Sequence, residues 1–173
     1  MNIDGYGPLK ARVKGGGNVH FMDRADARKV YDNTIDKIPE RIEALRHLCE
    51  QNGYSNDPAG WTALVADNVE VERDDGGIAS LAPEWSTIAL DIALAISQLL
   101  IDRSGGQLRW KFYTGSKNSL DYQRPVLVGF GNVASKTYHL NLYLPMTNFA
   151  RGVANGKPMR DLDEYLEYIA TKI

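Results

Sequence analysis

Histidine and cysteine, the side chains that most often act as bases, nucleophiles and metal ligands, are scarce in this sequence. Its 173 residues include three histidines and one cysteine. His47 and Cys49 lie two positions apart in a segment with helical periodicity, where side chains at that spacing point to different faces. The spacing favours a surface histidine and a small core cysteine over a catalytic pair. With one cysteine, neither an intrachain disulfide nor a structural zinc site is expected.

Two glycine-rich stretches have the composition of phosphate-binding loops but not their context. Residues 129–134 match the dinucleotide motif G-x-G-x-x-A and follow a predicted strand. The residues after them alternate as a strand does, whereas the motif must open a helix. The triple glycine at 15–17 lacks the following helix and the Lys-Ser/Thr pair of a P-loop. A hairpin turn and a flexible hairpin tip are therefore the favoured interpretations, and no cofactor is expected.

Carboxylates remain as groups that could carry chemistry, and Asp91 has the most unusual position among them. It interrupts Ser86–Ile101, a run that is apolar on every face of the helix it would form. A buried charge must be paired or hydrogen-bonded, or its pKa shifts until the group is neutral. We expect a structural pair between Asp91 and Arg124, with Tyr122 or Tyr138 as the alternative donor. The alternative function for this residue is a carboxylate-dependent hydrolase with Asp91 at its site.

A second group of carboxylates is concentrated in one short stretch. Residues 54–104 carry a net charge of −7 in a chain whose total is −2, and five of their acidic side chains fall within residues 67–75. Like charges this close repel one another, so the stretch is either a solubilising surface or a docking surface that attracts a basic protein. It lies between two tryptophans that could anchor an interface. The predicted partner-binding residues are Asp67, Glu70, Glu72, Asp74, Asp75, Trp61 and Trp85.

The last third of the chain is basic, with a net charge of +4 over residues 105–173. Its cations alternate with aromatic rings, as in a stacking platform for single-stranded nucleic acid. However, the sequence pI is about 5.9 and no three basic residues are consecutive, so a solvated sheet face is favoured over a nucleic-acid partner. The residues concerned are Arg109, Lys111, Arg124 and Lys136 with Trp110, Tyr113 and Tyr138.

The periodicity of apolar residues and the capping residues predict the helices and strands that position these side chains. A helical stripe runs over residues 35–49, and Pro39 within it either kinks one long helix or begins a second. Asp57 and Pro58 predict the start of a short helix, since aspartate caps a helix and proline suits its first position. Asp161 predicts the start of a C-terminal helix.

The central element is predicted to be a helix over residues 83–104. A transmembrane span needs roughly 20 apolar residues with few or no charges, whereas this run contains Asp91, Ser97 and Gln98. A buried core helix is therefore favoured. The sequence then alternates with a period of two in three stretches, which predicts an antiparallel meander. These strands are expected at residues 107–114, 124–130 and 137–144, with a loop over 145–158.

The expected architecture is therefore α+β: one globular domain over residues 1–173 with four to five helices, in which helix 83–104 packs on the three-stranded sheet. A short edge strand is expected at residues 69–72. Residues 1–20 are expected to form a loose glycine-rich arm or hairpin. The N-terminus has no apolar run typical of a secretory signal, which favours a cytoplasmic protein.

We interpret the chain as a non-catalytic protein-binding module, because such a protein needs only a stable scaffold and a distinctive surface. In size, single-domain form and acidic patch it is similar to small bacterial immunity proteins, the cognate inhibitors of secreted toxins. The resemblance is one of general type and rests on no residue motif. It implies a toxin with a basic cleft as the partner, and no membrane.

Overall fold

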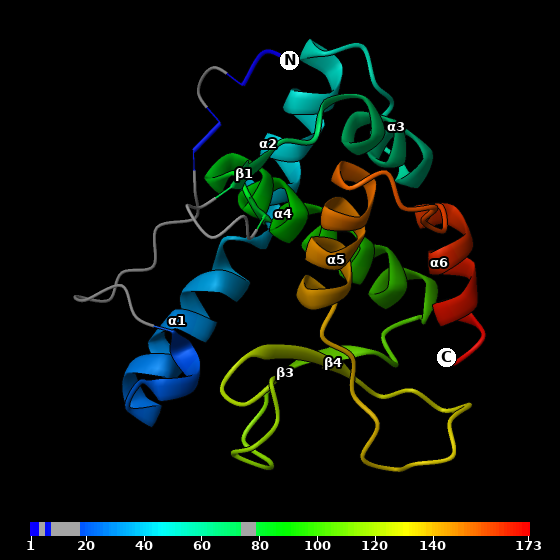
Figure 1. The fold of residues 1–173 in the computed structure, drawn as a ribbon. Coiled ribbons are helices and arrows are strands. Elements are labelled where there is room, and N and C mark those ends of the chain that lie inside the picture. Colours follow the sequence, from blue (N-terminus) through cyan, green and yellow to red (C-terminus); the bar gives the residue numbers. More distant parts are fainter. Residues whose placement is uncertain (4–5, 8–17, 74–78) are drawn as a thin grey trace.

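The computed structural model describes residues 1–3, 6–7, 18–73 and 79–173. These residues combine helices with two separate two-stranded antiparallel sheets, so the mixed helix-and-sheet class is confirmed (Figure 1). The number of helices and the single three-stranded sheet were predicted wrongly. The helical elements are η1 (Val19–Phe21), α1 (Arg24–Asp36), α2 (Ile38–Gln51), α3 (Pro58–Asn68), α4 (Pro83–Arg103), α5 (Tyr143–Ala154) and α6 (Leu162–Ala170). The strands are β1 (Val71–Arg73), β2 (Ala79–Leu81), β3 (Arg109–Phe112) and β4 (Pro125–Val128).

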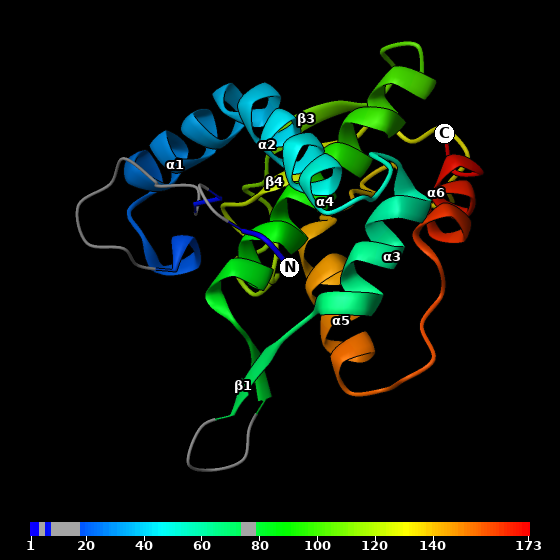
Figure 2. The same cartoon turned by 90° about the horizontal axis from the view of Figure 1, so that it is seen from above.

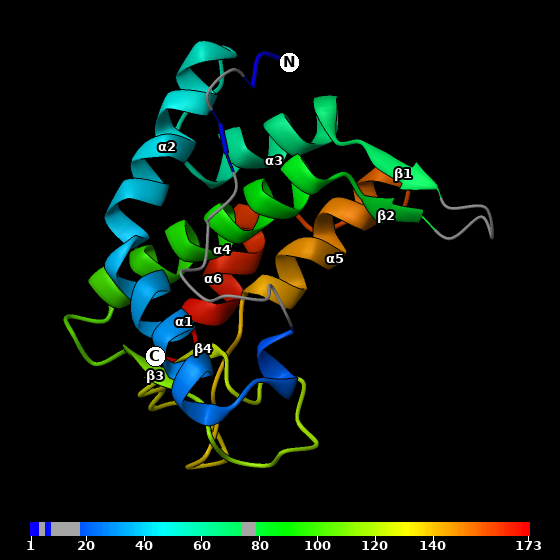
Figure 3. The same cartoon turned by 90° about the vertical axis from the view of Figure 1, so that its left-hand side faces the viewer.

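Helix α4 lies in the middle of the molecule, with α2 and α5 packed along it (Figures 1 and 3). Its apolar side chains are buried on several faces, including the fully buried Ile88 and Ile96. In length and composition α4 could cross a membrane, but 67% of its apolar stretch is buried inside the protein. That burial is typical of a core helix and explains why α4 carries apolar residues on all of its faces.

Aspartate side chains cap two of the peripheral helices. The Asp57 side chain accepts a hydrogen bond from the Gly60 backbone N–H at 2.8 Å and caps α3. The Asp23 side chain caps α1 in the same way, through Ala25. Pro39 separates two helices: α1 ends at Asp36, and Pro39 lies in the first turn of α2, where no intrahelical N–H bond is lost.

The first two predicted strands pair as β3 and β4, with Arg109 opposite Val128. The third predicted strand, 137–144, was wrong, because only Leu140 forms a bridge, with Leu127. Helix α5 begins at Tyr143 and occupies most of the predicted loop over 145–158. Proline at position 145 lies in the first turn of this helix, where it is tolerated. The buried face of α5 has helical spacing through Met146, Phe149 and Ala150.

Strands β1 and β2 form a hairpin that projects from the helical body, far from β3 and β4 (Figures 2 and 3). The predicted edge strand therefore exists but begins at Val71 and not at residue 69. Residues 74–78, between the two strands, lie outside the described residues. Most of the predicted arm over 1–20 also does, although Ile3 and Tyr6 pack against the core.

Candidate functional sites

Asp91 lies at the centre of a buried polar cluster that joins three parts of the chain. It is fully buried, and Arg41 of α2 binds both of its carboxylate oxygens: Nε donates to Oδ1 at 2.9 Å and Nη2 donates to Oδ2. The hydroxyl of Tyr6 donates a third hydrogen bond, to Oδ2. The Arg41 Nη1 group also donates to the backbone carbonyl of Gly7 at 2.8 Å. The N-terminal segment, α2 and α4 therefore meet at one carboxylate.

This arrangement fits a structural cross-link better than a catalytic site. Burial raises the pKa of Asp91, while the donors on Arg41 and Tyr6 act in the opposite direction by stabilising the charged form. Burial and the Asp91 charge raise the pKa of the Tyr6 hydroxyl, so it remains a donor. Both carboxylate oxygens accept hydrogen bonds from within the fold, and the side chain has no exposed surface through which a substrate could reach it.

The predicted partner of Asp91 was wrong. Arg124 donates instead to the Asn18 side chain at 3.2 Å. Of the alternative donors, Tyr122 packs against the ring of His20 and Tyr138 against the ring of Phe130. Arg124 lines a cavity beside Leu90 and Leu94 of α4, whereas Asp91 contacts Arg41 of α2. Local sequence carries no signal for which distant cation faces a buried acid.

The acidic stretch contributes to a surface cleft of about 220 Å³, which we call the acidic cleft. Its carboxylates are Asp67 and Glu70 from the predicted set and Glu84, which the sequence analysis missed. Glu84 lies in the first turn of α4, where negative charge suits the helix dipole. Glu84 is close to Asp67 and Glu70 because the β1–β2 hairpin brings the start of α4 back to the end of α3.

The acidic cleft is supported by rigid contacts. The Tyr54 hydroxyl donates to the Asp67 carboxylate at 3.0 Å and accepts from Asn68 at 2.8 Å. The Ala82 backbone N–H donates to the Glu70 carbonyl at 3.3 Å, which joins the two strands at the base of the hairpin. Asp67 and Glu70 are thus held on backbone that is fixed to the core.

Neither tryptophan is an exposed anchor. Trp61 is 3% exposed and Trp85 is 2% exposed, so both belong to the core. The Trp61 indole N–H donates to the Asn56 side chain at 3.1 Å, while Trp85 contributes to the floor of the acidic cleft. Glu72 is exposed on β1. The predicted Asp74 and Asp75 lie outside the described residues.

A second surface cavity, of about 600 Å³, lies beside β3 and the segment that follows β4; we call it the basic groove. Three cations, three aromatic rings and an imidazole line it, and none of its lining residues is acidic. Most of these residues were predicted from sequence, whereas Phe130 and His139 were not. The residues are Arg109, Lys111, Lys136, Tyr113, Tyr138, Phe130 and His139.

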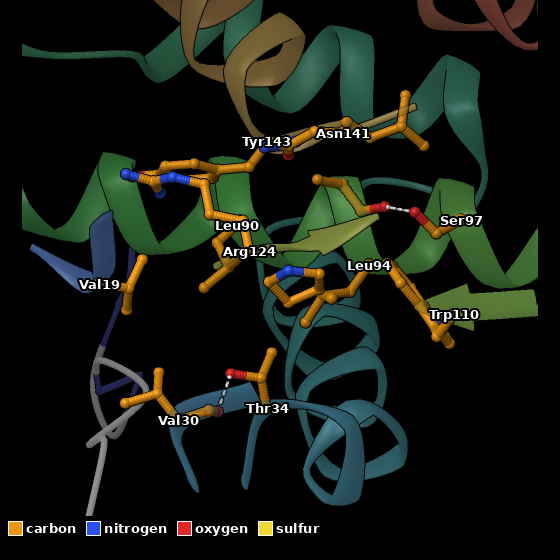
Figure 4. A pocket seen from close by; sticks show the side chains of 13 residues that line it. Val19, Val30, Thr34, Leu90, Leu94, Ser97, Trp110, Arg124, Asn141 and Tyr143 are labelled. Atoms are coloured by element: carbon orange, nitrogen blue, oxygen red, sulfur yellow. Dashed lines mark hydrogen bonds between the residues drawn. The ribbon is translucent and has the colours of Figure 1, made fainter. Parts of the chain in front are cut away.

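Two members of the predicted basic and aromatic set lie elsewhere. Trp110 and Arg124 line a third cavity of about 170 Å³ between α1 and α4 (Figure 4). Leu90 and Leu94 give this cavity an apolar wall, and the hydroxyl of Ser97 is satisfied by the Ala93 carbonyl at 2.7 Å. The Trp110 indole N–H is buried without a partner among the described residues. Strand alternation explains why Trp110 does not line the basic groove: its side chain points to the opposite face of β3 from those of Arg109 and Lys111.

His139 pairs with Asp121 through Nε2 at 3.0 Å, and its other ring nitrogen lies 3.1 Å from the Thr137 carbonyl. The Asp121 carboxylate and the Thr137 carbonyl are both acceptors, and together they orient the imidazole. Across the ranges that the structure describes, no group of three or more His, Cys, Asp or Glu side chains is arranged to hold a metal ion.

The chain was compared with protein-family models, with curated proteins and with solved structures, and none of the three comparisons gave a match.

Proposed function

We propose that this protein is a non-catalytic binding module that docks a basic protein on the acidic cleft and the adjoining β1–β2 hairpin. The observation that carries the proposal is the convergence of Asp67, Glu70 and Glu84 on one cleft. Within the described part of the chain, none of these three carboxylates forms an ion pair. A cleft with unneutralised acids favours a lysine or arginine side chain from a partner.

The expected gain lies mainly in association rate and selectivity. An exposed ion pair contributes only about 0–1 kcal/mol, because water and salt screen it. The summed field of several like charges acts over a longer range, so it speeds the encounter with a basic surface and disfavours acidic competitors. Glu72 lies on β1, two residues after Glu70 of the cleft, so a partner can contact the cleft and the hairpin together.

The biological form of this proposal is an immunity-type inhibitor in the cytoplasm that neutralises a toxin by covering a basic cleft. Such a role requires no active site in the inhibitor. It requires a rigid scaffold with a surface of opposite charge to the target, and the core contacts of Tyr54 and Trp85 support this for the acidic cleft.

The test is to capture a binding protein from the native source, identify it by mass spectrometry and purify it. Its association rate is then measured by surface plasmon resonance at low and at physiological ionic strength (~0.15 M). Glu70→Gln with Glu84→Gln is expected to lower the association rate at low salt and to flatten its salt dependence. The matched control, Asp163→Asn with Glu164→Gln on α6, removes the same charge from another surface.

The proposal fails if the cleft variant folds normally, as judged by circular dichroism, and associates at the unchanged rate. It also fails if the control variant loses as much as the cleft variant, because net charge alone would then explain the effect.

A further inference from the structure

We propose that the basic groove is a separate binding site for single-stranded nucleic acid. This inference does not depend on the acidic cleft, because the β1–β2 hairpin beside that cleft lies far from β3 and β4, which border the basic groove (Figure 3). The sequence suggested basic and aromatic residues in alternation. The structure adds that a defined subset of them lines a single cavity.

The cations are spaced along a strand. Arg109 and Lys111 are both exposed on one face of β3, two residues apart, while Phe112 is buried on the other face. A rise of about 3.3 Å per residue places their attachment points about 6.6 Å apart. That is close to the spacing of successive phosphates in an extended single strand. Lys136 supplies a third cation from the segment after β4.

These charges are not used within the fold. In the described part of the chain, neither Arg109, Lys111 nor Lys136 has an ion-pair partner, and no carboxylate lines the groove. A positively charged groove without internal neutralisation is the electrostatic component of a site that follows a phosphate backbone.

The rings provide the second component. Tyr113 and His139 stack with ring centres 4.2 Å apart, and Phe130 and Tyr138 form a perpendicular pair at 5.1 Å. Each of these side chains is only partly buried, so ring surface remains accessible beside the cations. Bases stack on such rings irrespective of sequence, because every base has a flat π face.

The groove is preorganised by hydrogen bonds. Asp121 binds His139 at 3.0 Å and Asn141 at 2.9 Å, which fixes the orientation of the imidazole. The Gln107 side chain donates to the Gly129 carbonyl at 2.8 Å. Gly129 has φ of 107° and a side chain there would meet the Gln107 carbonyl, so this close approach requires glycine. The His139 ring and the Gly129 backbone are therefore already fixed before a ligand binds.

The rings favour a nucleic acid over an acidic peptide, which needs cations but not stacking surfaces. They also favour a single strand over a duplex, whose bases are already stacked on one another. The acidic peptide, including the hairpin of a second copy of this chain, is therefore an alternative that the experiment must separate.

The experiment measures fluorescence anisotropy of short fluorescein-labelled oligothymidylate and oligouridylate with the full chain. Contacts to three phosphates predict a slope of log affinity against log salt of about −2, since each phosphate contributes about −0.7 for a single strand. Arg109→Gln, Lys111→Gln and Lys136→Gln together are expected to weaken binding at least about tenfold and to bring this slope near zero. The matched control is Arg151→Gln, Lys157→Gln and Arg160→Gln, which removes three cations from α5 and the segment before α6.

A second variant separates stacking from charge. Phe130→Leu with Tyr138→Leu is expected to weaken binding several-fold while the salt slope stays unchanged, because the phosphate contacts remain. Circular dichroism checks that each variant folds.

The proposal is overturned if no binding is measured at about 0.05 M salt, if the control variant loses as much affinity as the groove variant, or if duplex DNA or poly-glutamate binds as tightly as the oligonucleotides. Unchanged oligonucleotide binding by Glu70→Gln with Glu84→Gln is expected, so failure at one end of the molecule is distinguishable from failure at the other.

Discussion

The guanidinium of Arg41 and the carboxylate of Asp91 form a two-point ion pair inside the core, although 50 residues separate them in sequence. Two charges removed from water are costly, and their mutual attraction offsets that cost only with good geometry and further hydrogen bonds. The hydroxyl of Tyr6 and the carbonyl of Gly7 supply those bonds. The pair therefore links α2 to α4 at a defined point in the core.

Removing either partner of this pair is expected to destabilise the protein strongly. Asp91→Asn or Arg41→Met should lower the free energy of unfolding by about 3–5 kcal/mol, because the remaining charge or dipole stays buried without its partner. Urea denaturation followed by circular dichroism measures the loss. The double variant Arg41→Met with Asp91→Leu should lose less than either single variant, since neither charge remains.

The same variants separate the structural role from the alternative hydrolase function. If Asp91→Asn remains as stable as the native protein and abolishes a measurable hydrolytic turnover, Asp91 is a catalytic residue and the structural assignment is wrong.

The capping carboxylate of Asp57 predicts a pH-dependent contribution to stability. Hydrogen bonds from the Gly60 backbone N–H and from Ser55 lower the pKa of Asp57 below its usual 3.8. Its contribution is therefore present above pH 3.8 and is lost as the pH falls through the lower pKa of the folded state. Asp57→Ala should cost about 1 kcal/mol at neutral pH, and this difference should shrink in acid.

Asp57→Asn is the matched control, because asparagine caps a helix but does not titrate. Unfolding free energies measured from neutral pH down to about pH 3 compare the three proteins. A deficit of Asp57→Ala that stays constant over that range would contradict the role of the ionised carboxylate.

Cys49 is expected to report on unfolding. It is fully buried, and burial raises the pKa of its thiol to about 11. Because only the thiolate reacts with disulfide reagents, native Cys49 should react with dithionitrobenzoate more than about a hundredfold slower than in urea. An added exposed thiol, Ser116→Cys, is the internal control and should react at once. Equal rates for the two thiols would show that the core opens readily.

The helices could be read from sequence where a cap and a periodic apolar face coincide. Asp57 before Pro58 located α3, and the apolar run after Pro83 located α4. The third strand could not be excluded, because residues before Pro145 alternate as a strand does while those after it repeat as a helix does. The contact between α5 and α4 decides between the two patterns, and this contact depends on the fold.

The candidate sites were only partly predictable for the same reason. Sequence found the acidic stretch, but Asp67 and Glu84 share one cleft because the β1–β2 hairpin brings the chain back, which no local pattern predicts. The sequence also identified the cations of the groove. The overall pI argued against an anionic ligand, but a pI sums the charges of the whole chain and does not record where they lie. The burial of Trp61 and Trp85 depends on packing between helices, so the local sequence does not predict it.

The order of the Arg41–Asp91 pair along the chain also bears on synthesis. A chain leaves the ribosome from its N-terminus, so α2 is made long before α4. Until position 91 emerges, the Arg41 guanidinium has no carboxylate to meet in the core and is better solvated outside it. We therefore expect α2 to reach its native packing against α4 only after residue 91 has emerged, because the buried guanidinium has no partner before that point.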